Sequence, residues 1–202
     1  MSQARPRLNR DAVLAAALRI IDEGGLEACT MRAVAAELGV EAMSLYWHVP
    51  NKDALLDGVI ELMLGEIEQE SLLDGDWSRS LGGFARTFRQ VVLRHRNALP
   101  LLASRPLGAY AAAGRMTEQG IASLERAGFD RTTAIRAART VTRYVMGFTL
   151  AERSPVPEAA PPTSSPALDE LLAAVAGDDP EELFEFGLET LIAGLGARLM
   201  PA

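Results

Sequence analysis

The 202-residue sequence contains a single cysteine and only two histidines. One cysteine excludes both an intramolecular disulfide and a cluster of thiolate metal ligands. No apolar run approaches the ~20 residues that a membrane-spanning helix needs, and the N-terminus MSQARPRLNR lacks the apolar core of an export signal. The HExxH, GxSxG and phosphate-loop spacings are also missing. We therefore expect a cytoplasmic protein that is not an enzyme, does not enter a membrane and needs no metal or cofactor.

The sequence also lacks an excess of positive charge, because its formal net charge is −7. Residues 1–60 hold six basic and eight acidic side chains, although three arginines precede the first acid and form a short basic arm. Further on, residues 77–153 hold thirteen arginines against four acids, while 154–197 hold nine acids and no base. Either these regions face each other or solvent across a dimer, or the arginines form a pocket or surface for an acidic ligand or partner.

What is present is the spacing of a helix-turn-helix in TMRAVAAELGVEAMSLYWHVPNK, residues 30–52. Thr30 is a predicted N-cap, and Val34 and Leu38 share one face of the helix that follows. Gly39 suits the left-handed position that ends this helix. A short turn then leads to a second helix, predicted over residues 42–48, whose Leu45 points at the first helix.

This second helix presents a group of side chains that suits base reading in a major groove: Ala42, Met43, Ser44, Tyr46, Trp47 and His48. Each aromatic side chain alone could be partly buried core. The sequence LYWH, followed at once by a helix breaker and a cation, favours contact with DNA. Asn51 is predicted to cap the next helix, and Lys52 in its first turn suits a phosphate oxygen.

Residues 8–56 resemble the DNA-binding domain of the Tet repressor family, through NRDAVLAAALRIIDEGG, TMRAVAAELGV and LYWHVPNKDALLD. The later segments WSRSLGGFARTFRQVVLRHRN, SRP, GFDRTTA, MGFTLAE and FGLETLIAGLGARL are similar in order and spacing to the tetracycline-repressor branch. The resemblance implies an all-α protein. It comprises a three-helix helix-turn-helix domain over residues 1–56 and a larger helical domain for ligand binding and dimerisation over 57–202.

Residue by residue, the resemblance also implies contacts with DNA. Base or groove contacts are expected from Arg32, Ala42, Met43, Ser44, Tyr46 and His48, and backbone contacts from Thr30, Trp47 and Lys52. The branch usually has Gln then Pro where this chain has Ala42 then Met43, so an amide that could pair with adenine is lost. The operator should therefore differ, and Arg32 is the best candidate for a guanine contact.

The rest of the chain reads as helices with clear start and stop signals. Helices are predicted from Asp76 or Ser78 to about residue 97, from Pro106 to near 128 and from Asp130 to about 153. The segment SPVPEAAPPTSSP, residues 154–166, is predicted to be an extended or mobile connection, followed by helices near 167–176 and 180–199.

Gly187 and Gly194 in the last predicted helix indicate close approach to another helix. The resemblance implies that this helix and the one over 130–153 pair with their copies in a homodimer. Two recognition helices would then lie about 34 Å apart, one turn of DNA. The alternative is that the last helix is an ordinary core helix within one chain.

A small-molecule inducer is expected to bind among the helices that follow the DNA-binding domain. The candidate residues are Phe84, Phe88, Met116, Tyr144 and Phe148, with Glu68, Arg105 and Gln119 as polar anchors. Each alone is ordinary core or surface, but together they suit a mainly apolar ligand. The tetracycline branch holds a magnesium–drug complex through a histidine just upstream of the RP dipeptide. That place is Leu101 or Leu102 here, with His95 nearby, so another hydrophobic inducer is expected.

The sequence thus predicts a repressor that a ligand releases from a palindromic double-stranded operator. We expect the ligand to displace the helix that begins at Asn51. The alternative function is a helical small-molecule-binding or scaffold protein without sequence-specific DNA binding, which Ala42 and the acidic N-terminal region favour. Cys29 reads as a small apolar residue before the helix-turn-helix, with a reactive sensor thiol as the alternative.

Overall fold

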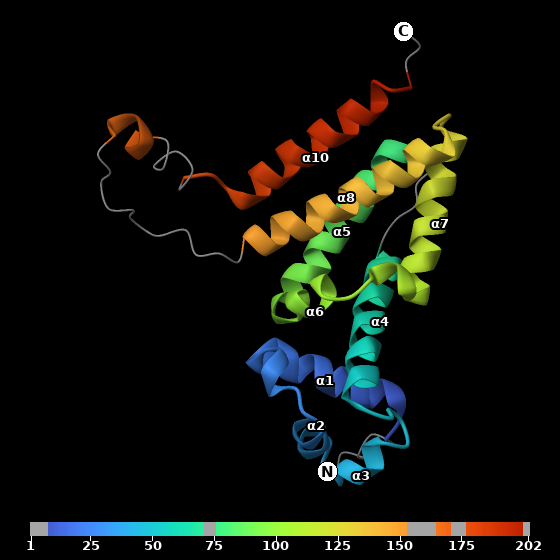
Figure 1. The fold of residues 1–202 in the computed structure, drawn as a ribbon, viewed down its shortest axis with the longest axis vertical. Helices are drawn as coiled ribbons and strands as arrows, with labels where there is room; N and C mark the ends of the chain where they lie inside the picture. The colour runs from blue at the N-terminus through green and yellow to red at the C-terminus, as the bar shows by residue number, and fades with distance from the viewer. Residues whose placement is uncertain (1–7, 71–75, 153–164, 171–176, 200–202) are drawn as a thin grey trace, which may run out of the picture.

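The computed structural model describes residues 8–70, 76–152, 165–170 and 177–199, and within these ranges it contains helices and no strand. Helices α1 (Arg10–Gly24), α2 (Met31–Leu38) and α3 (Ala42–Leu45) form one end of the molecule, with a 3₁₀ turn η1 (Leu26–Ala28) between the first two. Helix α4 (Lys52–Glu70) leads from this end into the remaining helices (Figure 1). The predicted all-α class and the N-terminal helix-turn-helix are confirmed.

The larger part of the molecule consists of α5 (Trp77–Arg94), α6 (Leu99–Ala103), α7 (Ala111–Arg126), α8 (Arg131–Ala151) and α10 (Pro180–Gly196). The 3₁₀ turns η2 (Arg96–Ala98) and η3 (Leu107–Ala109) flank α6. Helices α8 and α10 run antiparallel, side by side, and both pack on α5 (Figure 1). No helix among the described residues is long and apolar enough to cross a membrane.

Several helices begin where a short polar side chain accepts a hydrogen bond from the first turn. Asp76 Oδ1 accepts from Ser78 N at 2.8 Å, and Asp130 Oδ1 accepts from Thr133 N at 3.1 Å. These starts confirm the predictions, whereas the start predicted at Pro106 is wrong. Helix α7 begins at Ala111, because its first turn is capped from another helix by Glu61, which accepts from Ala112 N at 3.1 Å.

The last part of the chain is described only in pieces. Residues 154–164 of the predicted connection and residues 171–176 of the helix predicted at 167–176 lie outside the described residues. Helix α10 confirms the final predicted helix but ends at Gly196, before residue 199.

One apolar core runs through both ends of the molecule, and α4 belongs to it along most of its length. Leu55 near the start of α4 and Ile67 near its end are both at most 1% exposed. The same cluster contains Val13 of α1 and Phe88 of α5. Because packed cores shift between discrete arrangements rather than deform freely, a displacement of α4 affects both ends.

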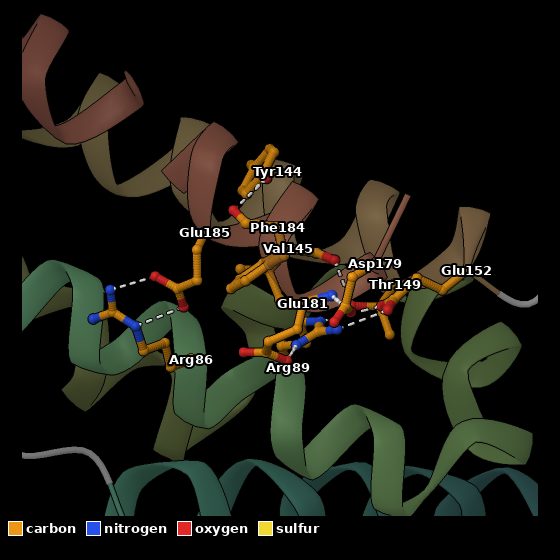
Figure 2. Close-up of polar contacts among 10 residues, drawn as sticks. All are labelled: Arg86, Arg89, Tyr144, Val145, Thr149, Glu152, Asp179, Glu181, Phe184 and Glu185. Atoms are coloured by element: carbon orange, nitrogen blue, oxygen red, sulfur yellow. Dashed lines mark hydrogen bonds and ion pairs between the residues drawn. The ribbon is translucent and has the colours of Figure 1, made fainter. Parts of the chain in front are cut away.

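Arginines of α5 bind acids that come from the ends of α8 and α10, as Figure 2 shows. Arg89, whose side chain is 6% exposed, donates to Glu152 Oε1 at 2.7 Å and also pairs with Glu181. The hydrogen bond to Glu152 raises the pKa of the Arg89 guanidinium above its ordinary range. Arg86 forms a bidentate pair with Glu185, at 2.7 and 2.6 Å. The polarised charges of the sequence therefore meet, in part, within one chain.

Tyr144 and Phe148 of α8 pack on α10 next to this ionic cluster. The Tyr144 hydroxyl donates to the Phe184 carbonyl at 2.8 Å, and both rings lie within 5.4 Å of the Phe184 ring, centroid to centroid. A Cβ at Gly187 would clash with the Tyr144 hydroxyl oxygen, so the glycine permits this close approach. The predicted helix contact is thus present at Gly187, whereas a Cβ at Gly194 would meet no described residue of another helix within 4 Å.

Candidate DNA-binding surface and ligand cavity

The helix-turn-helix forms as local chemistry requires. Thr30 Oγ1 accepts from Ala33 N at 3.1 Å and caps α2. Gly39 adopts the left-handed conformation, with φ 66°, and ends that helix. Leu45 of α3 and Val34 of α2 are both 0% exposed, so the apolar faces of the two helices pack against each other. These features confirm the predicted motif.

Residues 42–48, predicted as the second helix of the motif, make up the recognition segment, and its helical part is shorter than predicted. Helix α3 ends at Leu45 rather than His48, and residues 46–48 form turns. Tyr46 N donates to Met43 O at 3.3 Å, and both His48 N and Val49 N donate to Leu45 O at 2.9 Å. The helix tightens here because Val49, 1% exposed, is anchored in the core and the proline that follows disfavours helical geometry.

Three large apolar side chains of this segment are exposed to solvent. The exposed fractions are 72% for Met43, 46% for Tyr46 and 88% for Trp47. Arg32, Thr30 and Lys52 are also exposed, while Ala42, Ser44 and His48 are half-buried. A cluster of exposed apolar and aromatic groups beside cations is typical of a binding surface rather than of a solvated face.

Helix α4 begins as the sequence predicts, with Asn51 Oδ1 accepting from Ala54 N at 2.8 Å. Lys52 then occupies the first turn of α4. Cys29 is 0% exposed, and burial raises the pKa of its thiol despite the opposing charge of Lys52. A sensor thiol needs access and a populated thiolate, so the geometry favours the reading of Cys29 as a small core residue.

A cavity of about 830 Å³ lies among α4, α5, α6, α7 and α8. Its walls are mainly apolar, with Leu64 and Ile67 from α4 and Met146 and Leu150 from α8. Four of the predicted ligand residues line it: Phe84, Phe88, Arg105 and Met116. The volume falls within the range of roughly 300–1,000 Å³ that small-molecule sites occupy.

The other predicted ligand residues lie elsewhere. Glu68 and Gln119 line a pocket of about 40 Å³ that shares Phe84 and Met116 with the cavity. Glu68 is held there by Arg115, whose two hydrogen bonds of 2.7 Å lower the pKa of the carboxyl. Tyr144 and Phe148 do not line the cavity, because α10 supplies the Phe184 ring on which they pack.

Sequence reasoning missed two arginines on the cavity wall. Arg139 and Arg143 of α8 both line it, together with Thr142. The signal that could have found them is a stripe at helical spacing, since Arg139, Arg143, Met146 and Leu150 follow one another at intervals of four, three and four residues.

Arg105 connects the cavity wall to the first half of α4. It donates to Asp57 Oδ1 at 2.6 Å and to Asp53 Oδ1 at 3.2 Å. The Tyr110 hydroxyl also donates to Asp57 Oδ1, at 2.9 Å. Burial, assisted by this hydrogen bond, raises the pKa of Tyr110 to about 12. The loop before α7 is therefore bonded to the part of α4 that directly follows the recognition segment.

The chain matches two protein-family models. "Bacterial regulatory proteins, tetR family" matches residues 13–59, and "Tetracyclin repressor-like, C-terminal domain" matches residues 71–199. The chain belongs to the tetR family. This membership confirms the predicted function of a ligand-responsive DNA-binding regulator that is not an enzyme.

The similarity to individual tetR-family proteins covers nearly the full length of the chain. The class A tetracycline repressor protein from transposon 1721 of Escherichia coli is 34% identical, over 95% of this chain and 92% of that protein. The crystal structure of TetR from Acinetobacter baumannii AYE is 35% identical with a TM-score of 0.79, covering 95% and 98% of the two chains. ActR of Streptomyces coelicolor, in complex with actinorhodin, is 29% identical with a TM-score of 0.79, covering 96% and 100%.

The tetR-family chain does not provide the metal-binding histidine expected of the tetracycline branch. The two candidates for that place, Leu101 and Leu102 of α6, are both at most 2% exposed. The nearby His95 does not line the cavity, and its Nδ1 lies 2.9 Å from Asp22 Oδ2 of α1. Within the described ranges, no three His, Cys, Asp or Glu side chains are grouped to hold a metal ion. These residues do not fit a magnesium–drug complex.

Proposed function

We propose that this regulator binds a palindromic operator as a homodimer and releases it when a mainly apolar small molecule fills the cavity. Residues 1–56 bind DNA, and residues 57–202 bind the ligand and the second copy. The observation that carries the proposal is that α4 serves both parts. Its first residue, Lys52, is exposed and lies shortly after the recognition segment, and Leu64 and Ile67 further along the same helix line the cavity.

In this proposal the exposed recognition segment enters a major groove. Base or groove contacts come from Arg32, Ala42, Met43, Ser44, Tyr46 and His48, and phosphate contacts from Thr30, Trp47 and Lys52. The exposure of Met43, Tyr46 and Trp47 supports these roles. Without Gln at position 42, the operator differs from one that the tetracycline branch reads.

The exposed faces of α8 and α10 support the homodimer. A groove between these helices, of about 480 Å³, includes Gly194, Leu191 and Val141. Leu183 and Phe186 of α10 are 47% and 71% exposed, which is costly for an isolated helix in water and suits an apolar interface. Pairing these faces across a two-fold axis sets two recognition segments about one turn of DNA apart.

The inducer in this proposal is an organic molecule bound without magnesium. The apolar cavity walls support it, as does the complex of the related ActR with actinorhodin. The buried Leu101 and Leu102 argue against a metal-bound drug.

In the mechanism we propose, the ligand and the operator favour different positions of α4. A ligand seated against Leu64 and Ile67 displaces the helix, and the bonds of Arg105 to Asp57 and Asp53 carry the shift towards the recognition segment. A switch from 1:99 to 99:1 between bound and released forms needs about 5.5 kcal/mol of differential ligand affinity.

The DNA half of the proposal is tested by selecting from a random-duplex pool with the purified full-length protein. The expected result is a palindromic sequence whose half-sites lie one helical turn apart. Enrichment of no sequence would overturn the proposed operator binding and favour the alternative of a small-molecule-binding protein without sequence-specific DNA recognition.

A further inference from the structure

Two arginines on the cavity wall differ from most of the other arginines of the larger helical part. Arg139 and Arg143 have no hydrogen-bond or ion-pair partner among the residues that the structure describes, whereas Arg86 and Arg89 of α5 and Arg115 of α7 each bind a glutamate. Both unpaired residues line the cavity, four positions apart on α8. Like charges at this spacing destabilise a helix by a few tenths of a kcal/mol, so stability does not explain the pair.

Arg139 and Arg143 are both exposed to solvent, and the rest of the cavity offers them no acidic partner among the described residues. Phe84 and Phe88 on α5, with ring centroids 5.7 Å apart, and Met116 on α7 make its apolar wall. No aspartate or glutamate lines the cavity within the described part of the chain. Arg105, the third guanidinium there, is already bonded to Asp57 and Asp53.

We propose that the inducer is an organic anion with an aromatic or otherwise apolar body, whose acidic group is bound by Arg139 and Arg143. The inference rests on the proposed function, because it names the chemical class of the inducer for the same cavity. Guanidinium groups bind acidic oxygens through parallel, charge-assisted hydrogen bonds. The apolar body then lies against Phe84, Phe88 and Met116. One molecule thus contacts both the apolar wall and the two arginines.

The test compares two fluorescent probes that share an aromatic body. One is 8-anilinonaphthalene-1-sulfonate, an anion, and the other is the uncharged N-phenyl-1-naphthylamine. Their affinities are measured for the full-length protein, for the double variant Arg139→Gln/Arg143→Gln and for the control Arg96→Gln/Arg126→Gln. The control removes the same charge from two exposed arginines that do not line the cavity. Circular dichroism checks that each variant keeps its helices.

The expected result is that the cavity-facing double variant binds the sulfonate at least about tenfold more weakly, a loss typical of one or two charged hydrogen bonds. Its affinity for the uncharged probe, and both affinities of the control, should stay within about twofold. Equal losses for both probes, or no loss for the sulfonate, would overturn the anion inference while leaving an apolar inducer cavity. Binding of neither probe by the unmodified protein would overturn both the anion inference and the cavity as a ligand site.

Discussion

The Arg105 guanidinium donates a 2.6 Å hydrogen bond to Asp57, which joins the wall of the cavity to the helix that follows the recognition segment. Asp53, one turn nearer to that segment, accepts a second bond from the same side chain. The two carboxylates are 44% and 83% exposed, so each bond contributes little to stability. Their importance lies in position, because they bond the cavity wall to the DNA-binding end of α4.

Replacing this arginine should weaken the communication between the two sites. In Arg105→Gln, we expect the change in operator affinity caused by a bound cavity ligand to be reduced by about 1 kcal/mol, within the usual range of such coupling energies. Fluorescence anisotropy of a labelled operator with and without ligand measures it. Arg115→Gln is the matched control, since Arg115 binds Glu68 in the half of α4 far from DNA. Equal effects in the two variants would refute the role of Arg105.

Tyr110 makes the same region sensitive to alkaline pH. Because its folded pKa of about 12 exceeds the ordinary value of 10.0, its contribution to stability is complete below pH 10.0 and is lost as the pH rises through 12. Tyr110→Phe should therefore be less stable than the unmodified protein at neutral pH, by about 1 kcal/mol for the lost hydrogen bond. Urea unfolding should show this difference shrinking above pH 10.0. A constant difference would contradict the assignment.

Arg32 should contribute to sequence specificity. Arg32→Ala is expected to weaken binding to the selected operator by about 1–3 kcal/mol and to relax the preference at one base pair of each half-site. Binding at fixed salt to the operator and to its single-base variants checks this. Arg126→Ala, which removes an exposed arginine on α7, should leave both properties unchanged. Loss of affinity without loss of base preference would reassign Arg32 to the phosphate backbone.

Lys52 should act on every duplex alike. Because a phosphate contact releases a bound counterion, Lys52→Gln is expected to reduce the slope of log affinity against log salt by about 1. The measurement is a salt series with operator and random-sequence duplexes. An unchanged slope would exclude a phosphate contact, and a loss confined to the operator would indicate base reading instead.

Arg89 and Arg86 provide a comparison of buried and exposed ion pairs on one helix. Arg89→Met leaves Glu152, 14% exposed, without its partner and should cost about 3 kcal/mol of the free energy of unfolding. Arg86→Met removes a guanidinium that is 45% exposed and should cost less than about 1 kcal/mol. Urea denaturation of both variants tests the difference, and equal costs would contradict the structural role of Arg89.

The sequence predicts those features whose causes are local. Thr30, Gly39, Asn51, Asp76 and Asp130 each act within about four residues of their own position, and the structure confirms all five. The start of α7 could not be predicted in this way, because the Glu61 carboxylate that caps it comes from α4.

The cavity shows the same limit. Phe88 and Phe148 are equally apolar aromatic residues in the sequence, yet one lines the cavity and the other packs on α10. Only the arrangement of the neighbouring helices distinguishes them. Helical spacing could have placed Arg139 and Arg143 beside Met146 and Leu150, but their lack of a partner among the described residues is a property of the folded surroundings.

The central claim is that the cavity and the DNA-binding surface are coupled through α4. The most direct measurement is the affinity of the selected operator with and without saturating 8-anilinonaphthalene-1-sulfonate, together with the probe affinity with and without saturating operator. The account predicts that each ligand weakens the other by the same factor, at least about tenfold, as thermodynamic linkage requires. Simultaneous binding with both affinities unchanged would contradict it.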